Sequence, residues 1–436
     1  MEFHDVLHGP IELGLPFNKA LFEELLFAPE IERLRNMRLM NFNVPLIQEL
    51  GSSKRLPHSV GVCYLAQKLG IKSLSSETHV TELMLAALLH DAAIPPYGHL
   101  VESTLRKQYP EFNHEDILSD LLFGTYHHSN TYHQIVPGRS LKLNSILNKY
   151  EIDIDHVLSL VKPQKPSTSA ISAQIDLDNI DNIHRMACLM GWPEAKPNLK
   201  KIIDNVKIDN KLNLVFKESA IEALETWQDI RQRIYTLIIA HPGCVAQNAF
   251  QSDLVASAID EKIMSPDNWY LDELRFEEEL RQNSTTKTYA DQLISGSTYR
   301  LIDYVWFTAT GAPQSQEWMT IDEKIKVELP ALGENERYFS WVEKGLISRR
   351  IDANIEDGEI RKIGSTSCSC LIARVHINVD GVSPPKLPHA DMEHWRSSVR
   401  RTMEDFIGKW RGDILYPEDY TGSYFKLKND QQLELY

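Results

Sequence analysis

Residues 77 to 91 read ETHVTELMLAALLHD, and this stretch is more informative about the fold than any other part of the chain. Ser75 and Ser76 stand before it as N-cap residues, and apolar residues cover all sides of a helix at LAALL. A helix that is apolar on all sides is buried among other elements. The dyad His90-Asp91 at its end therefore lies away from solvent, where an ionisable pair requires a partner.

Helical periodicity continues on both sides of this segment, from about residue 18 to about residue 260. We predict further helices over 58–69, ending at Gly70, over 172–190, and over 218–240, ending before Pro242. The pattern predicts a helical bundle that makes up most of the chain.

The sequence changes character beyond about residue 285. The stretches STYRLIDYVWFTATG (297–311) and STSCSCLIARVHINVDG (365–381) are rich in β-branched and aromatic residues, which is typical of strands. The segment 394–410 predicts an amphipathic helix. The expected fold class is therefore mainly α, with a helical core over 1–270 and a smaller C-terminal α+β domain over 271–436.

Composition excludes several classes of protein. The chain has 436 residues, 42% of them hydrophobic and 25% charged, which excludes disorder as its main state. The net charge of −15, from 46 basic and 61 acidic residues, argues against general binding to nucleic acids or membrane surfaces. Five cysteines without paired CxxC spacing argue against a disulfide framework and a structural zinc site. Because long apolar runs and a signal peptide are lacking, we expect a soluble, cytoplasmic protein.

Histidines are concentrated in one part of the chain. Eight of the sixteen lie between residues 58 and 133: His58, His79, His90, His99, His114, His127, His128 and His133. Imidazole and carboxylate groups are suitable ligands for a divalent metal, and a cation would offset the cost of burying Asp91. A further ligand can come from a downstream helix, on which Asp178, Asp181 and Arg185 share a face. One acid is expected at the metal and another on Arg185.

The order of these residues resembles a known family. His58, His90-Asp91 and Asp178 match the H…HD…D signature of the HD-domain metal-dependent phosphohydrolases. The wider resemblance, over about residues 3 to 250, is to their deoxynucleoside triphosphate triphosphohydrolase branch, which includes the SAM-and-HD-domain protein. Six segments carry it: DVLHGPIEL (5–13), ERLRNMRLM (32–40), KRLPHSVGVCYLA (54–66), LLHDAAIPPYGHLVE (88–102), FNHED (112–116) and ISAQIDLDNID (171–181). The resemblance implies an HD-domain helical bundle.

The resemblance also implies roles for individual residues. A divalent metal ion would be held by His58, His90, Asp91 and Asp178, and the residues do not distinguish Mn, Fe, Mg, Zn, Ni and Co. Arg55 would contact a substrate phosphate, and His99, Glu102 and His114 would be catalytic groups outside the metal ligands. A bound cation polarises a phosphoryl oxygen and acidifies water, while a nearby His and Glu position that water or protonate the leaving group.

The chain departs from the family at several positions. Ile94 stands where the family has a further histidine after the HD dyad. Asn179, Asn182, Met186 and Leu39 replace residues with which the family grips deoxyribose and polyphosphate. We therefore expect nucleotide phosphate hydrolysis without the family's usual preference for deoxynucleotides. The alternative is that neighbouring residues rebuild the pocket and the enzyme is an ordinary dNTP triphosphohydrolase.

Three functions remain open. The first is a (d)NTP triphosphohydrolase in which metal-activated water attacks the nucleotide. The second is an HD-type di-iron oxygenase, with further ligands from among His99, His114, His127 and His128. The third is a nucleotide-sensing protein whose hydrolytic activity has decayed. ERLRNMRLM and Arg55 belong to the triphosphohydrolase branch and favour the first function. A nucleotide substrate and, by resemblance, a homo-oligomer are the expected partners.

Overall fold

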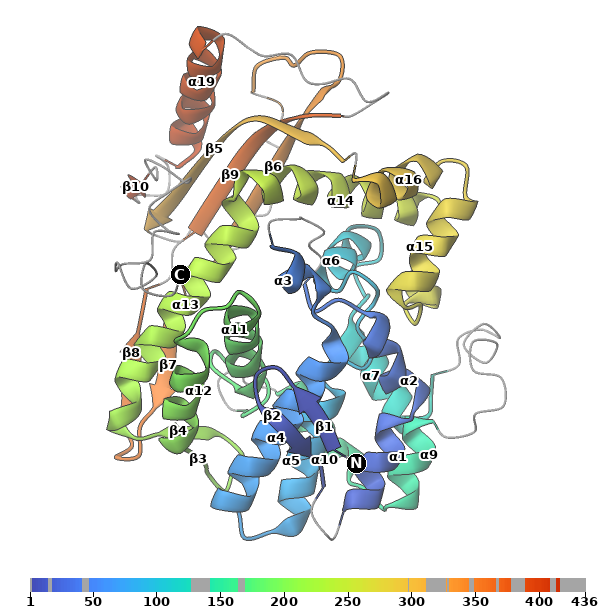
Figure 1. Ribbon diagram of the computed structural model, residues 1–436, viewed down its shortest axis with the longest axis vertical. Helices are drawn as coiled ribbons and strands as arrows, with labels where there is room; N and C mark the ends of the chain where they lie inside the picture. Colours follow the sequence, from blue (N-terminus) through green and yellow to red (C-terminus); the bar gives the residue numbers. More distant parts are fainter. Residues whose placement is uncertain are drawn as a thin grey trace, which may run out of the picture. The chain divides into compact units, whose positions relative to one another are not determined.

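The structure, a computed structural model, describes residues 2–14, 18–40, 47–126, 142–163, 169–296, 298–310, 327, 329–344, 349–365, 368–377, 389–407 and 413–415. It is mainly α-helical, with small antiparallel sheets (Figure 1). The helical unit comprises Met1–Trp227, Ser252–Asp291 and Ile351–Ile363, and the sheet unit comprises Gln228–Gln251, Gln292–Arg350 and Gly364–Tyr436. Segments of the two units alternate along the chain, whereas the sequence suggested one boundary at about residue 270.

Among its described residues, the helical unit contains short and long helices and three two-stranded hairpins. Its helices are α1 (Lys19–Leu26), α2 (Pro29–Glu32), α3 (Gln48–Ser52), α4 (Arg55–Ser73), α5 (Glu77–Leu89), α6 (His99–Gln108), α7 (His114–Phe123), α9 (Leu143–Lys149), α10 (Ile154–Val161), α11 (Leu177–Leu189), α12 (Ala195–Asp204) and α15 (Glu273–Gln282). The hairpins pair β1 (Glu2–Asp5) with β2 (Gly9–Glu12), β3 (Val206–Ile208) with β4 (Leu214–Phe216), and β7 (Ile351–Asn354) with β8 (Ile360–Ile363).

The apolar segment in the middle of the first half forms α5, as predicted. The Ser76 side chain caps the helix by accepting a hydrogen bond from the backbone N–H of His79. Every residue from Val80 to Leu89 is buried, and α5 packs against α4 and α10. His90 follows directly at the C-terminal end. Because α5 is buried, His90 and Asp91 at its end lie in the interior of the helical unit.

Two predicted helix boundaries were wrong. Helix α4 does not end at Gly70 but continues to Ser73, because Gly70 lies against Val80 of α5. A Cβ atom at position 70 would lie 3.1 Å from the Val80 Cγ1 atom, so the glycine allows close packing. Helix α11 begins at Leu177 rather than at 172, because Asp176 caps it by accepting from the Asn179 N–H.

The helix predicted over 218–240 is confirmed and is followed directly by another. It is α13 (Ile221–Ala240), and Pro242 then begins α14 (Pro242–Asp260), since proline suits the first position of a helix. These two helices and α16 (Lys287–Ser295) each contain residues of both units. None of the helices in the described parts of the chain is long and apolar enough to cross a membrane.

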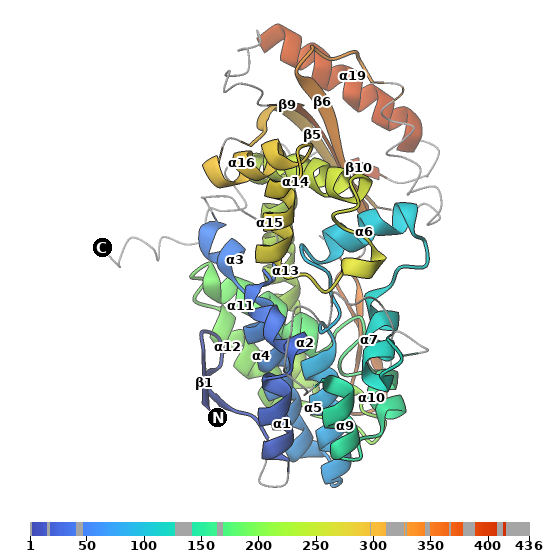
Figure 2. The ribbon, with the colours of Figure 1, turned by 90° about the vertical axis from the view of Figure 1, so that its right-hand side faces the viewer.

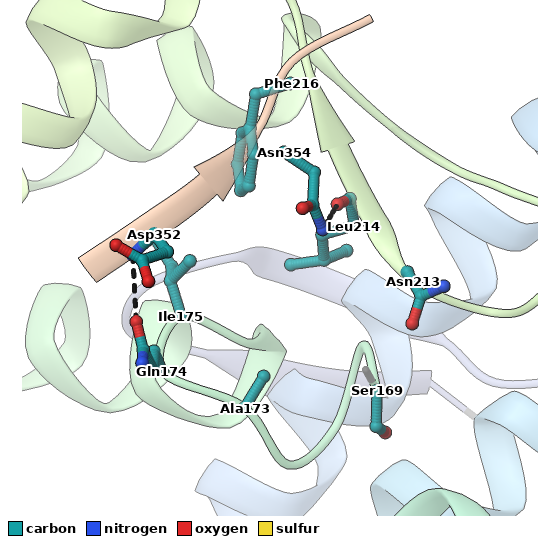
Figure 3. A pocket seen from close by; sticks show the side chains of 9 residues that line it. All are labelled: Ser169, Ala173, Gln174, Ile175, Asn213, Leu214, Phe216, Asp352 and Asn354. Atoms are coloured by element: carbon teal, nitrogen blue, oxygen red, sulfur yellow. Dashed lines mark hydrogen bonds between the residues drawn. The ribbon is translucent and has the colours of Figure 1, made fainter. Parts of the chain in front are cut away.

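The β7–β8 hairpin belongs to the helical unit although it lies late in the sequence. The backbone N–H of Asp352 donates to the Gln174 side-chain oxygen at 2.9 Å, and Ile355 pairs with Phe216 in a parallel bridge. A small, largely polar pocket lies beneath this contact (Figure 3). Its lining residues are Ser169, Ala173, Gln174, Ile175, Asn213, Leu214, Phe216, Asp352 and Asn354. The hairpin therefore covers the loop that leads into α11.

The sheet unit is built on a four-stranded antiparallel sheet. Its strand order is β10 (Asp413–Leu415), β5 (Arg300–Thr310), β9 (Cys368–His376) and β6 (Glu336–Lys344). The predicted strands are thus confirmed as β5 and β9. Helix α19 (His389–Ile407) packs along this sheet (Figure 2), beginning five residues before the predicted start at 394. The ring of Trp395 stacks on Tyr338, and Arg396 pairs with Asp303 at 2.7 Å.

Candidate metal centre

Three helices bring two histidines and one aspartate together. His58 lies in the first turn of α4, His90 at the end of α5, and Asp178 in the first turn of α11. Asp178 Oδ1 lies 2.9 Å from His58 Nε2 and 3.8 Å from His90 Nε2. One ligand atom from each residue falls within 4.8 Å of the others, a grouping that can hold a metal ion. Three of the four predicted metal ligands thus meet at one point.

His90 has one ring nitrogen engaged and the other available. Its Nδ1 atom donates to the backbone oxygen of Ala87 at 2.8 Å, so the neutral imidazole carries its lone pair on Nε2. That Nε2 atom is buried and has no hydrogen-bond partner among the described residues. The nearest carboxylate oxygens belong to Asp178 and, at 3.7 Å, to Asp91. A buried ring nitrogen that faces carboxylates and has no hydrogen-bond partner among the described residues fits a metal-ligand position.

Asp91, the fourth predicted ligand, pairs with Arg55. The Arg55 Nη1 atom lies 2.5 Å from Asp91 Oδ2, and both side chains are buried. Burial by itself would raise the pKa of Asp91, but the charge of Arg55, followed by His90 and His58, lowers this pKa well below its usual range. Asp91 is therefore ionised beside His90. Arg55 was predicted to contact a substrate phosphate. It lies beside the candidate metal centre, where its guanidinium group forms an ion pair with Asp91.

The backbone at Gly98 makes room for Arg55. Gly98 precedes α6 with φ at 56°, in the region that glycine adopts most easily. A Cβ atom there would lie 2.4 Å from Arg55 Nη2. Glycine is thus required both by the backbone conformation and by the guanidinium group beside it.

A buried network holds the other nitrogen of His58. Asp181 Oδ1 accepts from His58 Nδ1 at 2.8 Å and from Arg185 Nε at 2.8 Å. Asp181 Oδ2 lies 2.6 Å from His8 Nε2 and 3.1 Å from Arg185 Nη2. The predicted pairing of Asp181 with Arg185 is confirmed. His8 lies in the segment DVLHGPIEL, but its sequence neighbours predict no role for it, because only the fold brings it to Asp181.

The charges in this network determine how His58 is protonated. Burial would raise the pKa of Asp181, but Arg185, His58 and His8 lower it well below its usual range. An ionised carboxylate only accepts hydrogen bonds, so His58 donates from Nδ1. Burial acts to lower the pKa of His58, yet hydrogen bonds to Asp178 and Asp181 raise it to about 9. Without a cation, both nitrogens of His58 therefore carry protons.

Acidic groups crowd the start of α11. Burial and then the charge of Asp178 raise the pKa of Asp176 to about 7, although Asp176 accepts from the N–H groups of Ala173 and Asn179. Burial would raise the pKa of Asp178, but the hydrogen bond from His58 and the charge of His90 lower it, while the charge of Asp91 opposes its ionisation. A cation between these carboxylates would relieve their mutual repulsion.

The three predicted catalytic residues form a second cluster. Glu102 is buried and accepts from His99 Nδ1 at 3.0 Å and from His114 Nδ1 at 2.8 Å, while Arg106 pairs with it at 2.8 Å. Burial would raise the pKa of Glu102, but the hydrogen bonds from His114 and His99 lower it well below its usual range. Glu102 therefore engages the Nδ1 atom of each imidazole. This group also has the ligand spacing of a metal site.

The positions at which the chain departs from the resembled family lie in or next to the core. Leu39, Met186 and Ile94 are buried apolar side chains. The Asn179 side chain donates to Asp176 at 2.9 Å. Asn182 is half-buried on α11. His127, His128 and His133 lie outside the described residues.

Comparisons with known proteins support the fold but name no activity. No family model matches the chain. It is 24% identical over 242 residues to the uncharacterized protein YwfO of Bacillus subtilis, covering 54% of this chain and 52% of that protein. An uncharacterized protein of Methanocaldococcus jannaschii is 22% identical over 242 residues, covering 55% and 47%. The aligned part thus spans about half the length of these curated relatives. A solved structure, a hypothetical protein from Aquifex aeolicus, has a TM-score of 0.59 at 17% identity and covers 92% of this chain and 99% of its own.

Proposed function

We propose that the chain is a metal-dependent phosphohydrolase that acts on nucleotides, most concretely as a (d)NTP triphosphohydrolase. The observation that carries the proposal is the buried His90 Nε2 atom. It has no hydrogen-bond partner among the described residues and faces Asp178 Oδ1, which also contacts His58 Nε2. Two imidazole nitrogens and neighbouring carboxylates suit a divalent cation of the first transition series. His58, His90 and Asp178 would hold it, with Asp91 as the fourth ligand.

The residues around the centre suit hydrolysis of a phosphate ester or anhydride. When bound, the cation would polarise a phosphoryl oxygen and acidify water. Arg55 places a buried positive charge beside the centre, which a substrate phosphate would share with Asp91. Glu102 holds the Nδ1 protons of His99 and His114, so that their Nε2 atoms can take a proton from water or give one to the leaving group.

The polar groups that would discriminate the sugar differ from those of the family that the sequence resembles. Leu39 and Met186 are buried apolar side chains without a polar group for a ribose, and the Asn179 side-chain nitrogen donates to Asp176. Loss of such partners relaxes discrimination between substrates. We therefore propose activity on both ribo- and deoxyribonucleoside triphosphates.

The test is metal analysis followed by a substrate screen. Purified protein should bind about one Mn²⁺ per chain and release triphosphate from dGTP, dATP, GTP or ATP. The His90→Ala and Asp91→Ala variants should lose the metal and the activity together, and their melting temperatures should no longer rise with added Mn²⁺. His4→Ala, a change at a histidine whose side chain is 80% exposed, serves as the control. Full metal occupancy in both site variants would contradict the assignment.

The stoichiometry separates the alternatives. The cluster of His99, Glu102 and His114 is a second group with ligand spacing, so two irons per chain would favour the di-iron oxygenase. Failure of the wild-type chain to bind any metal would favour a nucleotide-sensing protein without hydrolytic activity. A strong preference for dGTP and dATP over GTP and ATP would contradict the proposed activity on both sugars, but not the metal-dependent hydrolysis.

A further inference from the structure

The N-terminal hairpin contacts the residues around the candidate metal centre, and His8 makes its contact to Asp181. His8 lies in the turn between β1 and β2, and its side chain is 4% exposed. Its ring lies against Gly61 of α4 and Asp181 of α11. Its Nε2 atom lies 2.6 Å from Asp181 Oδ2, although the two residues are 173 positions apart in the sequence. The route from His8 to the centre runs through Asp181, which in turn contacts His58 Nδ1.

Asp181 depends on its donors because it is fully buried. Its carboxylate accepts from His58, His8 and Arg185 and has no exposed surface. Removing a donor from a buried carboxylate leaves a charged oxygen that the interior does not solvate. Of the groups on Oδ2, His8 makes the shorter contact, at 2.6 Å against 3.1 Å for Arg185. The orientation of Asp181, and with it that of the His58 ring, therefore depends on His8.

A glycine on α4 leaves space for this arrangement. Gly61 lies one helical turn after His58. A Cβ atom at position 61 would lie 2.4 Å from Asp181 Oδ2, 2.4 Å from Arg185 Nη2 and 3.0 Å from His8 Nε2. Any larger residue there would collide with the network. The glycine on α4, the helix that carries His58, therefore leaves room for the side chains of Asp181, Arg185 and His8.

The turn itself is fixed by the same network. Asp5 Oδ1 accepts from the backbone N–H groups of Leu7 and His8, each at 2.9 Å. Asp5 Oδ2 accepts from Arg185 Nη1 at 2.6 Å. The carboxylate that forms the turn is therefore tied to the arginine that holds Asp181. Arg185 thus holds Asp5, and Asp5 holds the backbone N–H of His8 in the position from which its side chain contacts Asp181.

We infer that His8 is a positioning residue for the metal centre: by donating to Asp181, it holds His58 in the orientation and tautomer that present Nε2 to a cation. The inference rests on the proposed metal centre and extends it to the N-terminal hairpin. The partner that fixes the far nitrogen of a ligating histidine, here Asp181, commonly contributes about 10- to 100-fold to metal affinity, and the loss of the His8 donor acts through that partner. For this role, the residue at position 8 has to place one N–H donor where Nε2 of His8 lies.

The experiment is Mn²⁺ titration of the full chain, with free Mn²⁺ measured by electron paramagnetic resonance. His8→Leu keeps the bulk and removes the donor, whereas His8→Gln keeps an N–H donor near the position of Nε2. We expect His8→Leu to weaken Mn²⁺ binding by about 10- to 100-fold, and His8→Gln to stay within a few-fold of the wild type. His4→Ala, on the same hairpin, should bind as the wild type does. Metal-free melting temperatures are recorded for each variant.

The outcomes separate the two levels of the proposal. Equal Mn²⁺ affinity in the wild type and a folded His8→Leu protein would overturn the role of His8 and leave the metal centre standing. Equal losses in His8→Leu and His8→Gln would also overturn it, because the donor would then be irrelevant. No binding by the wild type would overturn the metal centre and this inference together. Should His8→Leu prove unfolded by circular dichroism, His8→Asn, whose shorter amide does not reach Asp181, replaces it.

Discussion

At the scale of single residues, Glu102 orients two histidine side chains, those of His99 and His114. It is buried, ionised and shared by two imidazoles, one of which, His99, has a side chain that is 71% exposed. A buried carboxylate that orients a solvent-accessible imidazole is a frequent arrangement for proton transfer. The cluster lies outside the proposed metal ligands, so its removal should separate chemistry from metal retention.

The first prediction concerns this separation. His99→Ala, Glu102→Gln and His114→Ala should each lower the rate of nucleotide hydrolysis by roughly 10²- to 10⁴-fold while retaining Mn²⁺. Steady-state kinetics and metal analysis of the same preparations provide the measurement. His156→Ala is the matched control, because His156 makes a similar bond to the buried Glu82, at 2.7 Å, in a different part of the helical unit. Wild-type turnover in one of these variants would show that the substituted residue is not catalytic. Loss of metal from a variant would instead indicate a two-metal centre.

The second prediction is a pH dependence of stability caused by His184. Burial lowers its pKa to about 4, and its ring nitrogens contact the Ile180 oxygen and the Asn198 amide. The unfolded state therefore binds this proton at about pH 6.5, whereas the folded state binds it only near pH 4. Between these values, the free energy of unfolding should fall as the pH falls, by about 3 kcal/mol in total from this group.

Urea unfolding at pH 6.5 and pH 4.5 measures this effect. His184→Gln is expected to be less stable than the wild type at pH 6.5, because the substitution disturbs a buried site, but to lose less stability on acidification. The difference between the two proteins isolates His184 from the carboxylates that titrate in the same range. Identical pH dependence in both would show that His184 is not held neutral in the folded state.

At the scale of elements, helix ends place nearly all the groups of the candidate site. His58 and Asp178 lie in the first turns of α4 and α11, and His90 directly follows the last residue of α5. His99 and His114 are the first residues of α6 and α7. Helix ends carry unsatisfied backbone groups and are set by caps rather than by the apolar face. The turns between these helices therefore control the geometry of the site.

The third prediction tests the turn before α6. Gly98→Ala should lower the free energy of unfolding by about 3 kcal/mol, because a Cβ atom would strain the backbone and push Arg55 from Asp91. Gly191→Ala is the control, since Gly191 also has a positive φ, of 73°, but a Cβ atom there would meet no described atom within 4 Å. That change should cost about 1 kcal/mol. Equal losses in chemical denaturation would mean that Arg55 moves aside without penalty.

At the scale of the whole molecule, the helical unit is completed by a late segment of the chain. Ile351 and Ala353 of β7 are fully buried, and Ile355 after it is nearly so, in the same unit as the candidate metal centre. Their apolar surface covers the β3–β4 hairpin and the loop before α11. The stability of the unit should therefore depend on residues far from it in sequence.

The fourth prediction follows from this return of the chain. Ile351→Ala should destabilise the helical unit by about 2 to 5 kcal/mol and raise hydrogen exchange in 206–216, because it opens a cavity beneath the hairpin. Ile360→Ala, on the same hairpin but 61% exposed, should change stability by no more than about 0.5 kcal/mol. Unchanged exchange in 206–216 with Ile351→Ala would show that the hairpin is not part of this unit's core.

Local pattern was sufficient for the elements and for much of the candidate site. The apolar run of α5, the β-branched runs of β5 and β9 and the mainly α fold class were predictable, because burial imposes a periodicity that neighbouring residues share. The meeting of His58, His90 and Asp178 was also predicted, because their order resembles the H…HD…D signature of a known family. Boundaries at Gly70 and residue 172 were not, since they depend on Val80 and on the cap at Asp176.

The partners of the polar groups were decided by the tertiary structure. The contact between His8 and Asp181, the pairing of Arg55 with Asp91, and the return of the β7–β8 hairpin join positions far apart in the chain. No periodicity records such contacts, because a buried charge requires a partner without specifying which residue supplies it. Which donor reaches a buried carboxylate depends on how helices and hairpins pack, and that is a property of the folded chain as a whole.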